Sequence, residues 1–390
     1  MTGADRLTVE LVRTPERLAA VGPAWMALWR SSGGAVFQSH AWIEAWWRTL
    51  PEAGRPRLAV ALGWRGDELA AVLPMVIQRR RGLRALEWAA KDHSDYCDGL
   101  ALAGPDRGAM LRRLWTGVVA AGGFDLAYLS HLQPDAAAFP VMAGAGPAGF
   151  HLRANHRRAV SLRVRSSWPT GRDWFESLPK KGRQNYRRGR KMLGEFGRAE
   201  FRRIGPAEPL GPVLDRIAEL KRDWLVRSGN RSTLVEDGAR PFRALVQVLA
   251  DLGLLRIYVL ECDGAIAAAA VNFVERGRMM AFVAAYDHAY ERASLGTVLM
   301  TDYMMAAFDE GVSEIDFLCG AEDYKLKFAT ARVEIVSLAG GRTLPGRLAV
   351  GLDALSPTLA ALRLRLAGAT GRLRPGGASE IPVESQPRRA

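Results

Sequence analysis

Apolar residues in the second half of the chain switch between helical and strand spacing. Val213, Ile217 and Leu220 recur at helical intervals, while Asp263-Gly264 separates two apolar runs as a hairpin turn does. In chain order, the pattern predicts strand Ala199–Ile204, helices that open at Pro212 and Pro241, strands Leu254–Glu261, Ala265–Glu275 and Arg278–Tyr286, helix Leu295–Glu310, strand Ser313–Leu318, helix Ala321–Ala329 and strand Arg332–Ala339. This order indicates an α/β (α+β) fold, in which helices flank a mixed, mostly antiparallel sheet.

The first half of the chain repeats the same order of elements. The pattern predicts strand Leu7–Val12, helices Thr14–Ser32 and Ser39–Leu50, a hairpin of Arg57–Trp64 with Glu68–Gln78, strand Leu83–Ala89, helix Asp106–Ala121, strand Phe124–Leu129, helix Asp135–Ala145 and closing strand Ala159–Val164. Two halves with one order of elements predict an internal structural duplication, although no sequence identity between them is obvious.

These elements predict four parts of the chain. Residues 1–165 form a non-catalytic domain on the substrate side, residues 166–198 a basic helical connector, and residues 199–341 the catalytic domain. Residues 342–390 combine a basic amphipathic helix, about Gly346–Ala367, with a Pro/Gly/Ser/Arg-rich tail that we expect to be disordered. The amphipathic helix is a candidate for peripheral membrane contact. Seven basic residues crowd the connector: Lys180, Lys181, Arg183, Arg187, Arg188, Arg190 and Lys191.

Charge and composition narrow the class of protein. The 390 residues carry a formal net charge of +13, which favours anionic partners such as nucleotide cofactors, nucleic acid or a membrane surface, unless the basic surface is merely solvated. No apolar run reaches the roughly 18 residues of a spanning helix, and Met1–Arg13 lacks a secretory core, so we predict a cytoplasmic protein. The three cysteines lie far apart without a CxxC pair, so we expect neither a disulfide framework nor a metal site.

The junction Tyr286–Thr297 is the first candidate site. Ser294 is a plausible N-cap of the following helix, and Gly296 lies early in that helix. Free amides at a helix N-terminus bind anions such as a diphosphate, and a glycine lets the backbone approach one closely. The alternative is a capped helix with no ligand. The corresponding loop of the first half, Lys91–Gly99, carries three aspartates that would repel an anion: Asp92, Asp95 and Asp98.

The segment Ile315–Ala329 is the second candidate site. A strand ends at Cys319-Gly320, and the following helix carries Glu322, Tyr324 and Lys325. Acyl transfer from a thioester needs an acid for the leaving thiolate, a base for the nucleophile and a donor to the oxyanion. We predict that Tyr324 is the acid and that Lys325 stabilises the acyl oxygen or a phosphate, although the helix could also be a purely packed one.

Four segments carry a resemblance to a known family: Phe37–Trp47, Arg183–Leu193, Ala284–Leu299 and Asp316–Ala329 with its Gly-Ala-Glu-x-Tyr-Lys core. Over about Leu7–Gly340, the chain resembles the GNAT superfamily. More narrowly it is similar to the BioF2-like or CelD-type acetyltransferases, relatives of the FemABX aminoacyltransferases. The resemblance implies tandem GNAT-like domains, acyl-CoA (acetyl-CoA) as donor and no metal. It also implies an amine or hydroxyl on a small-molecule, glycan or lipid acceptor, in polysaccharide or lipid assembly.

The expected roles of the site residues follow from the motifs and this resemblance. The donor is expected to contact Ser294, Leu295, Gly296 and Thr297, and the acceptor Tyr286, Glu322, Asp95 and Arg187. Asp287 and Asp316 are candidates for the base, or else orient the loop and cap the strand end.

Two alternatives to this function remain open. Glu291–Gly296 departs from the GNAT diphosphate loop, since Ser294 stands where that loop has its first glycine. An aminoacyl-tRNA-dependent transferase of the FemABX kind therefore stays open, with tRNA as the donor carrier. A basic nucleic-acid-binding protein is the other alternative. The basic residues of the connector lie on several faces without interleaved aromatics, which makes nucleic acid an unlikely partner.

Overall fold

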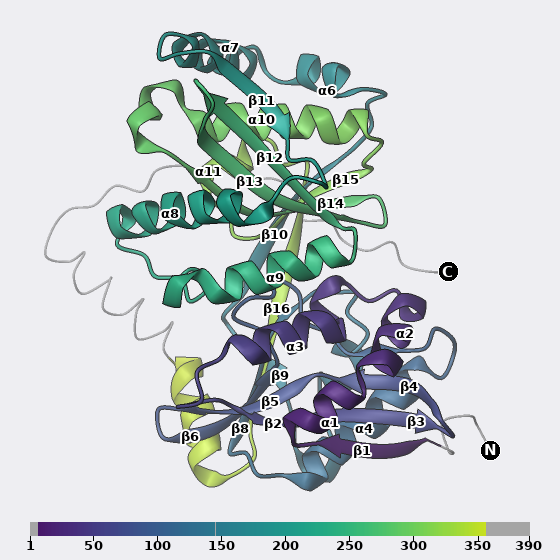
Figure 1. Ribbon diagram of the computed structural model, residues 1–390. Coiled ribbons are helices and arrows are strands. Elements are labelled where there is room, and N and C mark those ends of the chain that lie inside the picture. The colour runs from purple at the N-terminus through teal and green to yellow at the C-terminus, as the bar shows by residue number, and fades with distance from the viewer. Residues whose placement is uncertain (1–6, 145, 356–390) are drawn as a thin grey trace, which may run out of the picture. The chain divides into compact units, whose positions relative to one another are not determined.

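The computed structural model describes residues 7–144 and 146–355 (Figure 1). The described chain divides into two units. Unit 1 contains the residues up to Ala159 and those from Glu334 onward, and unit 2 is Val160–Val333.

Unit 1 contains two sheets, of strand order β1-β3-β4-β7 and β2-β5-β6-β8-β16, the last strand being shared between the units. Its elements are β1 (Thr8–Val12), α1 (Pro15–Ala20), α2 (Gly22–Ser32), η2 (Val36–Gln38), α3 (His40–Thr49), β2 (Arg57–Leu58), β3 (Val60–Arg65), β4 (Glu68–Leu73), β5 (Met75–Arg80), β6 (Leu83–Trp88), β7 (Leu100–Ala101), α4 (Arg107–Ala121), β8 (Leu126–Leu132), α5 (Phe139–Met142), η3 (Pro147–Gly149), β9 (Arg153–Ala154) and most of β16 (Ala331–Gly341). Helix α4 packs against β3 and β4, and Trp88, Trp115 and Phe124 are buried in the core there.

The predicted hairpin of unit 1 is divided between its two sheets. The expected strand Glu68–Gln78 is split at Pro74 into β4, which pairs with β3, and β5, which pairs with β6. Proline has no amide hydrogen to donate to a ladder, so a strand interrupted by proline can change partners at that point. Two predicted helices are also shorter or divided: Thr14–Ser32 breaks at Val21 into α1 and α2, and only α5 forms within Asp135–Ala145.

Unit 2 contains one sheet of strand order β11-β12-β13-β14-β15-β10. The pair β14–β15 is parallel, and the other neighbouring strands are antiparallel. Its elements are β10 (Ala159–Arg165), α6 (Gly171–Ser177), α7 (Lys180–Gly194), β11 (Ala199–Arg203), α8 (Leu210–Ser228), η4 (Asp237–Ala239), α9 (Arg240–Asp251), β12 (Leu255–Cys262), β13 (Ala265–Glu275), β14 (Arg278–Tyr286), η5 (His288–Ala293), α10 (Leu295–Asp309), β15 (Glu314–Cys319) and α11 (Asp323–Leu326). The predicted mixed, mostly antiparallel sheets flanked by helices are confirmed.

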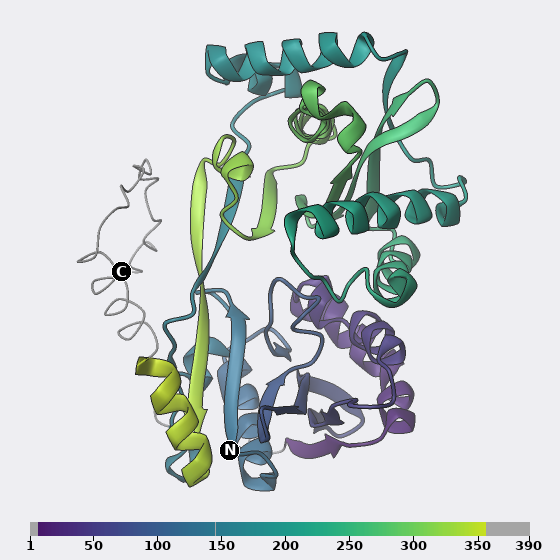
Figure 2. The ribbon, with the colours of Figure 1, turned by 90° about the vertical axis from the view of Figure 1, so that its left-hand side faces the viewer.

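Helices cover both faces of the sheet in unit 2. Helices α8 and α9 pack on one face and α10 packs on the other, with α7 outside α10 (Figure 2). Helix α7 lies close to η5, just before α10, because Gly189 lacks a side chain. A Cβ there would lie 2.6 Å from the carbonyl oxygen of Ala293. Helix α6 is held against α10 in the same way, since a Cβ on Gly171 would overlap the backbone of Met305. The basic connector is therefore packed against the helix that starts at the candidate site.

The two closing strands pair differently from the prediction. We expected Ala159–Val164 to close the first domain and Arg332–Ala339 the second. Instead β10 pairs with β15, with Val164 opposite Ile315, and β16 pairs with β8, with Ala339 opposite Tyr128. The units therefore depart from the predicted ranges 1–165, 166–198 and 199–341.

Charge explains the partner that β10 takes. Arg163 and Arg165 of β10 form ion pairs with Glu314 and Asp316 of β15, at N–O distances of 3.1–3.6 Å. Periodicity predicts that a segment is a strand, but the partner is chosen by side chains distant in sequence.

The C-terminal part of the chain is described only to residue 355. Residues 344–355 are helical, as predicted for Gly346–Ala367, and the rest of that helix and the predicted tail lie outside the described residues. Among the described residues, no helix combines the length and apolar character needed to cross a membrane.

Candidate functional site

The parallel strands β14 and β15 diverge after a short paired stretch. They pair only where Arg278–Met280 meet Glu314–Asp316. Beyond this stretch, β14 stays paired with β13 as far as Tyr286, and β15 stays paired with β10 as far as Cys319. The ladder between β14 and β15 therefore does not continue to residues 281–286 and 317–319 in the part of the chain that the structure describes.

A buried aspartate shapes the end of β15. Leu318 has a left-handed backbone, φ 59°, which costs about 1–3 kcal/mol for a residue with a side chain. Its amide donates to Oδ1 of Asp316 at 2.8 Å, and the hydroxyl of Ser161 donates to the same oxygen at 2.9 Å. Arg163 lies 3.1 Å from Oδ2, and Asp316 is fully buried. This buried ion pair stabilises the bend that separates β15 from β14.

The N-terminus of α10 provides free backbone amides. Ser294 is the N-cap residue by position, as expected, but its backbone is left-handed (φ 52°) and its hydroxyl makes no capping hydrogen bond. Its carbonyl accepts from the amides of Thr297 and Val298. Among described residues, the amides of Leu295 and Gly296 have no acceptor. These two donors, at the positive end of the helix dipole, suit an anionic group.

Gly296 is not required by the packing of the protein. A Cβ at this position would meet only the ring of Tyr286, at an ordinary contact distance of 3.7 Å. Tyr286 ends β14, so its ring lies beside the first turn of α10. The space above Gly296 is therefore available to a bound molecule.

Asp287 orients the loop between β14 and α10. Its Oδ1 accepts from the amide of Ala289 at 2.9 Å, which caps η5, and its Oδ2 lies 2.7 Å from Arg216 of α8. Both carboxylate oxygens are engaged, which favours the loop-orienting alternative over the role of a base.

Tyr324, Lys325 and Glu322 lie at the end of β15. The predicted helix Ala321–Ala329 is limited to α11 (Asp323–Leu326). Nζ of Lys325 lies 3.1 Å from the carbonyl oxygen of Cys319 and 2.9 Å from Oε2 of Glu322, so Lys325 ties α11 to the strand end.

Tyr324 keeps its proton at neutral pH and remains accessible. Its side chain is 42% exposed. Burial of the hydroxyl, and then the charges of Glu322 and Tyr286, raise the pKa of Tyr324 to about 12. The phenol is therefore available as a proton donor.

Two residues of α8 that the sequence analysis did not assign to the site lie beside it. The ammonium of Lys221 stands 4.3 Å from the ring centroid of Trp224. Burial lowers the pKa of Lys221, the charge of Glu322 opposes this, and the charge of Lys325 adds to it, which places Lys221 close to both. In the sequence, Trp224 continues the helical spacing of Val213, Ile217 and Leu220, and nothing local marks Lys221.

The corresponding place in unit 1 is filled by its own loop. Strands β6 and β8 also run parallel over only two positions, Ala85–Leu86 with Leu126–Ala127. The loop Lys91–Gly99 returns to β8, where the amide of Cys97 donates to the carbonyl of His131 at 2.8 Å. In unit 1, this loop therefore lies beside β8 at the place that corresponds to the divergence of β14 and β15.

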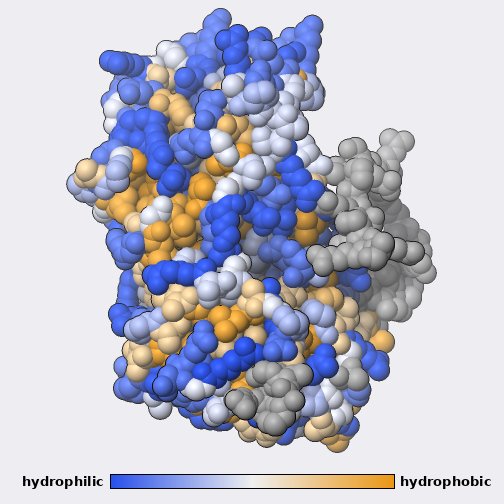
Figure 3. Space-filling model, turned by 90° about the vertical axis from the view of Figure 1, so that its right-hand side faces the viewer, coloured by the Kyte–Doolittle hydropathy of each residue, from blue (hydrophilic) through white to orange (hydrophobic). Residues whose placement is uncertain are grey.

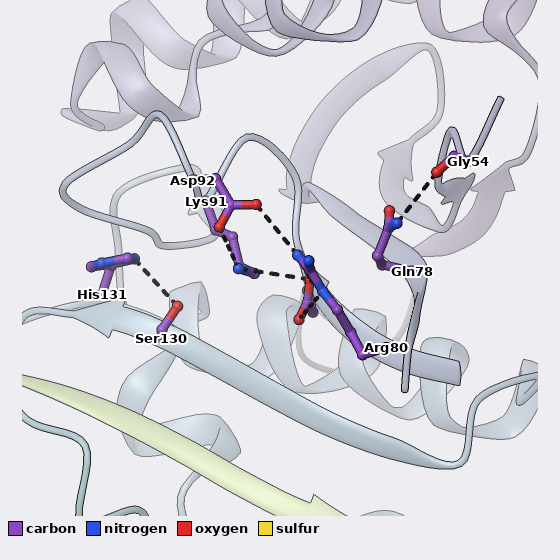
Figure 4. A network of polar contacts seen from close by, with 8 residues as sticks. Gly54, Gln78, Arg80, Lys91, Asp92, Ser130 and His131 are labelled. Carbon is purple, nitrogen blue, oxygen red and sulfur yellow. Dashed lines mark hydrogen bonds and ion pairs between the residues drawn. The ribbon is translucent and has the colours of Figure 1, made fainter. Parts of the chain in front are cut away.

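The three aspartates of that loop are not a repulsive cluster. Asp92 is paired with Lys91 at 2.6 Å and with Arg80 at 3.3 Å (Figure 4). Asp98 accepts from three backbone amides at 2.7–2.8 Å, while burial raises its pKa to about 6. Asp95 is half-buried in the same loop, and its expected contact with the acceptor stays a prediction.

Replacing His131 with asparagine should remove a pH-dependent loss of stability. Burial, and then the charge of Lys91, lower the pKa of His131 to about 4, whereas an unfolded histidine titrates near about 6.5. The free energy of unfolding is therefore largest above about pH 6.5. It decreases by up to about 3 kcal/mol as the pH falls from about 6.5 to about 4. Asparagine tolerates the left-handed backbone of this position, φ 61°. Urea unfolding at about pH 7.5 and about pH 4.5 measures the effect, and an undiminished loss in His131→Asn would contradict it.

Helix α7 presents a basic outer face. Tyr186 and Arg190 face inward, with Asp302 of α10 at 2.6 and 3.4 Å. The exposed side carries Lys180, Lys181, Arg187, Arg188 and Lys191. The surface at the top of Figure 3, over α6 and α7, is accordingly mainly hydrophilic. The guanidinium of Arg187 lies 6.0 Å from the ring of Phe175 of α6, and its expected contact with the acceptor stays a prediction.

Two other features of the described residues lie apart from this chemistry. A cavity of about 300 Å³ is lined by β11, β12 and α9, including Arg203, Gly205 and Arg256, and contains none of the expected site residues. No group of three or more His, Cys, Asp or Glu side chains in the described chain is arranged to hold a metal.

Comparisons with known proteins bear on unit 2 and on the whole fold. Residues 180–326 match the family model of an acetyltransferase (GNAT) domain. No curated protein matches the chain in sequence.

Two solved structures share the fold. The first is the C-terminal domain (DUF2156) of a protein named as a lysylphosphatidylglycerol synthetase, from Agrobacterium fabrum. Its TM-score is 0.54 at 13% identity, over 86% of this chain and 96% of that chain. The second is FemX, with a TM-score of 0.52 at 10% identity, over 84% of this chain and 96% of that chain. At these identities the likeness is one of fold.

Proposed function

We propose that this chain, a member of the GNAT superfamily that shares its fold with FemX, transfers an acyl group from acyl-CoA to an amine or hydroxyl acceptor. The observation that carries the proposal is the divergence of β14 and β15 beside the free amides of α10 and the phenol of Tyr324. These features support a site in unit 2 for a strand-like arm and an anion, next to a proton donor.

The donor fits this place by its own chemistry. The pantetheine arm of CoA is extended and contains amides, which can pair with β14 beyond the end of its ladder with β15, as a short strand would. Its diphosphate would then lie at the amides of Leu295 and Gly296, at the positive end of the α10 dipole. Ser294 and Thr297 flank this position. The carbonyl of Thr297 is already engaged, because it accepts a hydrogen bond from the hydroxyl of Thr301 one turn later.

In the proposed reaction, the acceptor attacks the thioester carbonyl directly. The new bond forms between the acceptor and the acyl carbon, the carbon–sulfur bond breaks, and Tyr324 gives its proton to the departing thiolate. The proton lost by the acceptor passes to Lys221 rather than to Asp287 or Asp316, because both aspartates are engaged in ion pairs with arginines. Burial lowers the pKa of Lys221, so its neutral amine forms more readily than that of an ordinary lysine.

Lys325 supports the reaction as a positioning residue. Its ammonium already has two protein partners, the carbonyl of Cys319 and the carboxylate of Glu322. Holding these partners fixes α11 at the end of β15, and Tyr324 stands next to Lys325 on that helix. A direct contact of the third ammonium hydrogen with the acyl oxygen is compatible with this arrangement.

An aminoacyl-tRNA donor is the second candidate, favoured by the outer face of α7. Five exposed cations on one helix, packed against α10 near the candidate site, suit the phosphates of a nucleic acid. The same face would serve a nucleic-acid-binding protein without transferase activity.

Thermal stabilisation separates these donors. A ligand that binds the folded state at a hundred times its Kd adds about 2.7 kcal/mol of stability. We expect acetyl-CoA to raise the Tm at moderate salt, and total tRNA and duplex DNA to leave it unchanged. A rise in Tm with tRNA, but not with duplex DNA or acetyl-CoA, would favour aminoacyl-tRNA as the donor. A rise with both tRNA and duplex DNA, but not with acetyl-CoA, would favour a nucleic-acid-binding protein.

A further inference from the structure

A cavity in unit 2 is separate from the residues proposed for acyl transfer, none of which lines it. Its volume is about 300 Å³, and it is formed by the end of β11, the start of β12, the first residue of α8 and the C-terminal end of α9. Small-molecule sites occupy about 300–1,000 Å³. A cavity of about 150 Å³ already admits benzene, so this one has room for a ring with a charged group attached.

The walls of the cavity are largely apolar. Ile204 follows β11, Leu255 and Ile257 belong to β12, and Leu210 and Ala250 come from α8 and α9. Ile204 and Ile257 are buried in the core that α8 and α9 form with the sheet, and Leu210 and Leu255 pack against that core. The hydrocarbon body of a ligand would therefore meet a fixed apolar surface.

Two arginines line the cavity and share a single carboxylate. Arg203 and Arg256 lie 3.4 and 3.7 Å from the carboxylate of Glu310. Nη1 of Arg256 donates to the carbonyls of Leu255 at 2.9 Å and Gly253 at 3.4 Å, whereas its buried Nε makes no hydrogen bond within the described chain. Two guanidinium charges against one carboxylate leave one positive charge in this group.

The N-terminus of α8 adds hydrogen-bond donors at the same cavity. Leu210 is the first residue of this 19-residue helix, no side chain caps the helix, and its first turn contains no acid. Among the described residues, the backbone amides of Leu210 and Gly211 have no backbone acceptor. An uncapped helix N-terminus without an acid favours a bound anion.

The acids that lie nearby in the fold are held by other groups. Glu208 and Glu261 share Arg202, each at 2.9 Å, and Glu208 also accepts from the amide of Gly205 at 2.6 Å. Asp251 accepts from a side-chain amide of α9 at 2.7 Å. None of these three carboxylates lines the cavity. An anion inside it would therefore meet arginines and backbone amides rather than carboxylates.

We propose that this cavity binds a small organic monoanion, a carboxylate with a short apolar body. The carboxylate accepts from Arg203, Arg256 and the first amides of α8, and the apolar body packs against Ile204 and Leu255. One surplus positive charge matches a monoanion better than a doubly charged phosphate ester. This site does not depend on the proposed acyl transfer.

Calorimetric titration of the full chain with benzoate tests the site. Benzyl alcohol has the same ring without the charge, and acetate has the charge without the ring. We expect benzoate to bind at least about tenfold more tightly than either one. A hydrogen bond to a charged group contributes about tenfold or more, and burial of the ring contributes about tenfold or more.

Three variants locate the bound benzoate. Arg203→Gln should weaken its binding by about tenfold or more. Ala250→Leu fills the cavity and keeps both arginines, so it should abolish binding. Glu310→Gln should tighten binding by about fivefold or more, because the arginines no longer share a carboxylate. A gain in affinity cannot result from a failure to fold.

Arg17→Gln is the matched control, because Arg17 also pairs with one glutamate and is 44% exposed, against 40% for Arg203, but belongs to unit 1. It should bind benzoate as the wild type does. Four results would overturn the proposal. One is the absence of benzoate binding, and another is equal binding of benzoate and benzyl alcohol. The third is an affinity that all three variants leave unchanged. The last is tighter binding of phenyl phosphate than of benzoate.

Discussion

Replacing Tyr324 with phenylalanine should lower kcat by about 10²–10⁴-fold and leave the affinity for acyl-CoA nearly unchanged. The phenol is a proton donor throughout the neutral range because its pKa is raised to about 12. Phenylalanine keeps the ring but has no proton for the leaving thiolate. Among the described residues, the hydroxyl of Tyr324 donates to no acceptor, so its removal costs no hydrogen bond and the fold should be unaffected.

Pre-steady-state transfer measures this effect at the chemical step. Tyr128→Phe is the control, because it makes the same chemical change on β8 of unit 1, whereas the proposed site is built from residues of unit 2. A Tyr324→Phe enzyme that carries out the chemical step at the wild-type rate would remove Tyr324 from the mechanism.

Replacing Gly296 with glutamate should raise the Kd for CoA by about 10³-fold. A carboxylate in the first turn of α10 would stand where the diphosphate is expected. At about 4 Å and an effective dielectric constant of about 20, the repulsion of two unit charges is about 4 kcal/mol. The same carboxylate interacts favourably with the helix dipole, so the variant should be at least as stable as the wild type. Calorimetric titration with CoA measures the Kd.

Two further substitutions at Gly296 separate charge from size. Gly296→Gln adds the same bulk without the charge, and should weaken CoA binding less than Gly296→Glu does. Gly296→Ala adds only a Cβ, which meets the ring of Tyr286 at 3.7 Å, so it should retain the fold and bind CoA within about tenfold of the wild type. An unchanged Kd in Gly296→Glu would show that the diphosphate does not bind at this helix.

Local pattern was sufficient to predict most elements of the fold. Strands β13 and β14 begin and end at the predicted residues, because the turn between them is set by Gly277, whose φ is 75°. The partners of β10 and β16 could not be predicted in the same way. The pairing of β10 with β15 depends on ion pairs between segments distant in sequence, such as Arg163 with Asp316.

The candidate site, too, could be predicted only where local sequence motifs mark its residues. Gly296 and Tyr324 were identified from short motifs, and the structure places the ring of Tyr286 near both. The surroundings of Asp316 could not be predicted, since its burial is created by Ser161 and Arg163 of β10. Lys221 was missed for the same reason, because its neighbours on α11 follow it by many residues.

We propose that the donor binds between the diverging strands of unit 2, and hydrogen–deuterium exchange of the full chain, with and without saturating CoA, locates the bound donor. We expect slower exchange of backbone amides in residues 281–286 and 295–297, with residues 83–99 of unit 1 unchanged. Slower exchange confined to residues 83–99 or to the outer helix α7, with residues 281–297 unaffected, would contradict it.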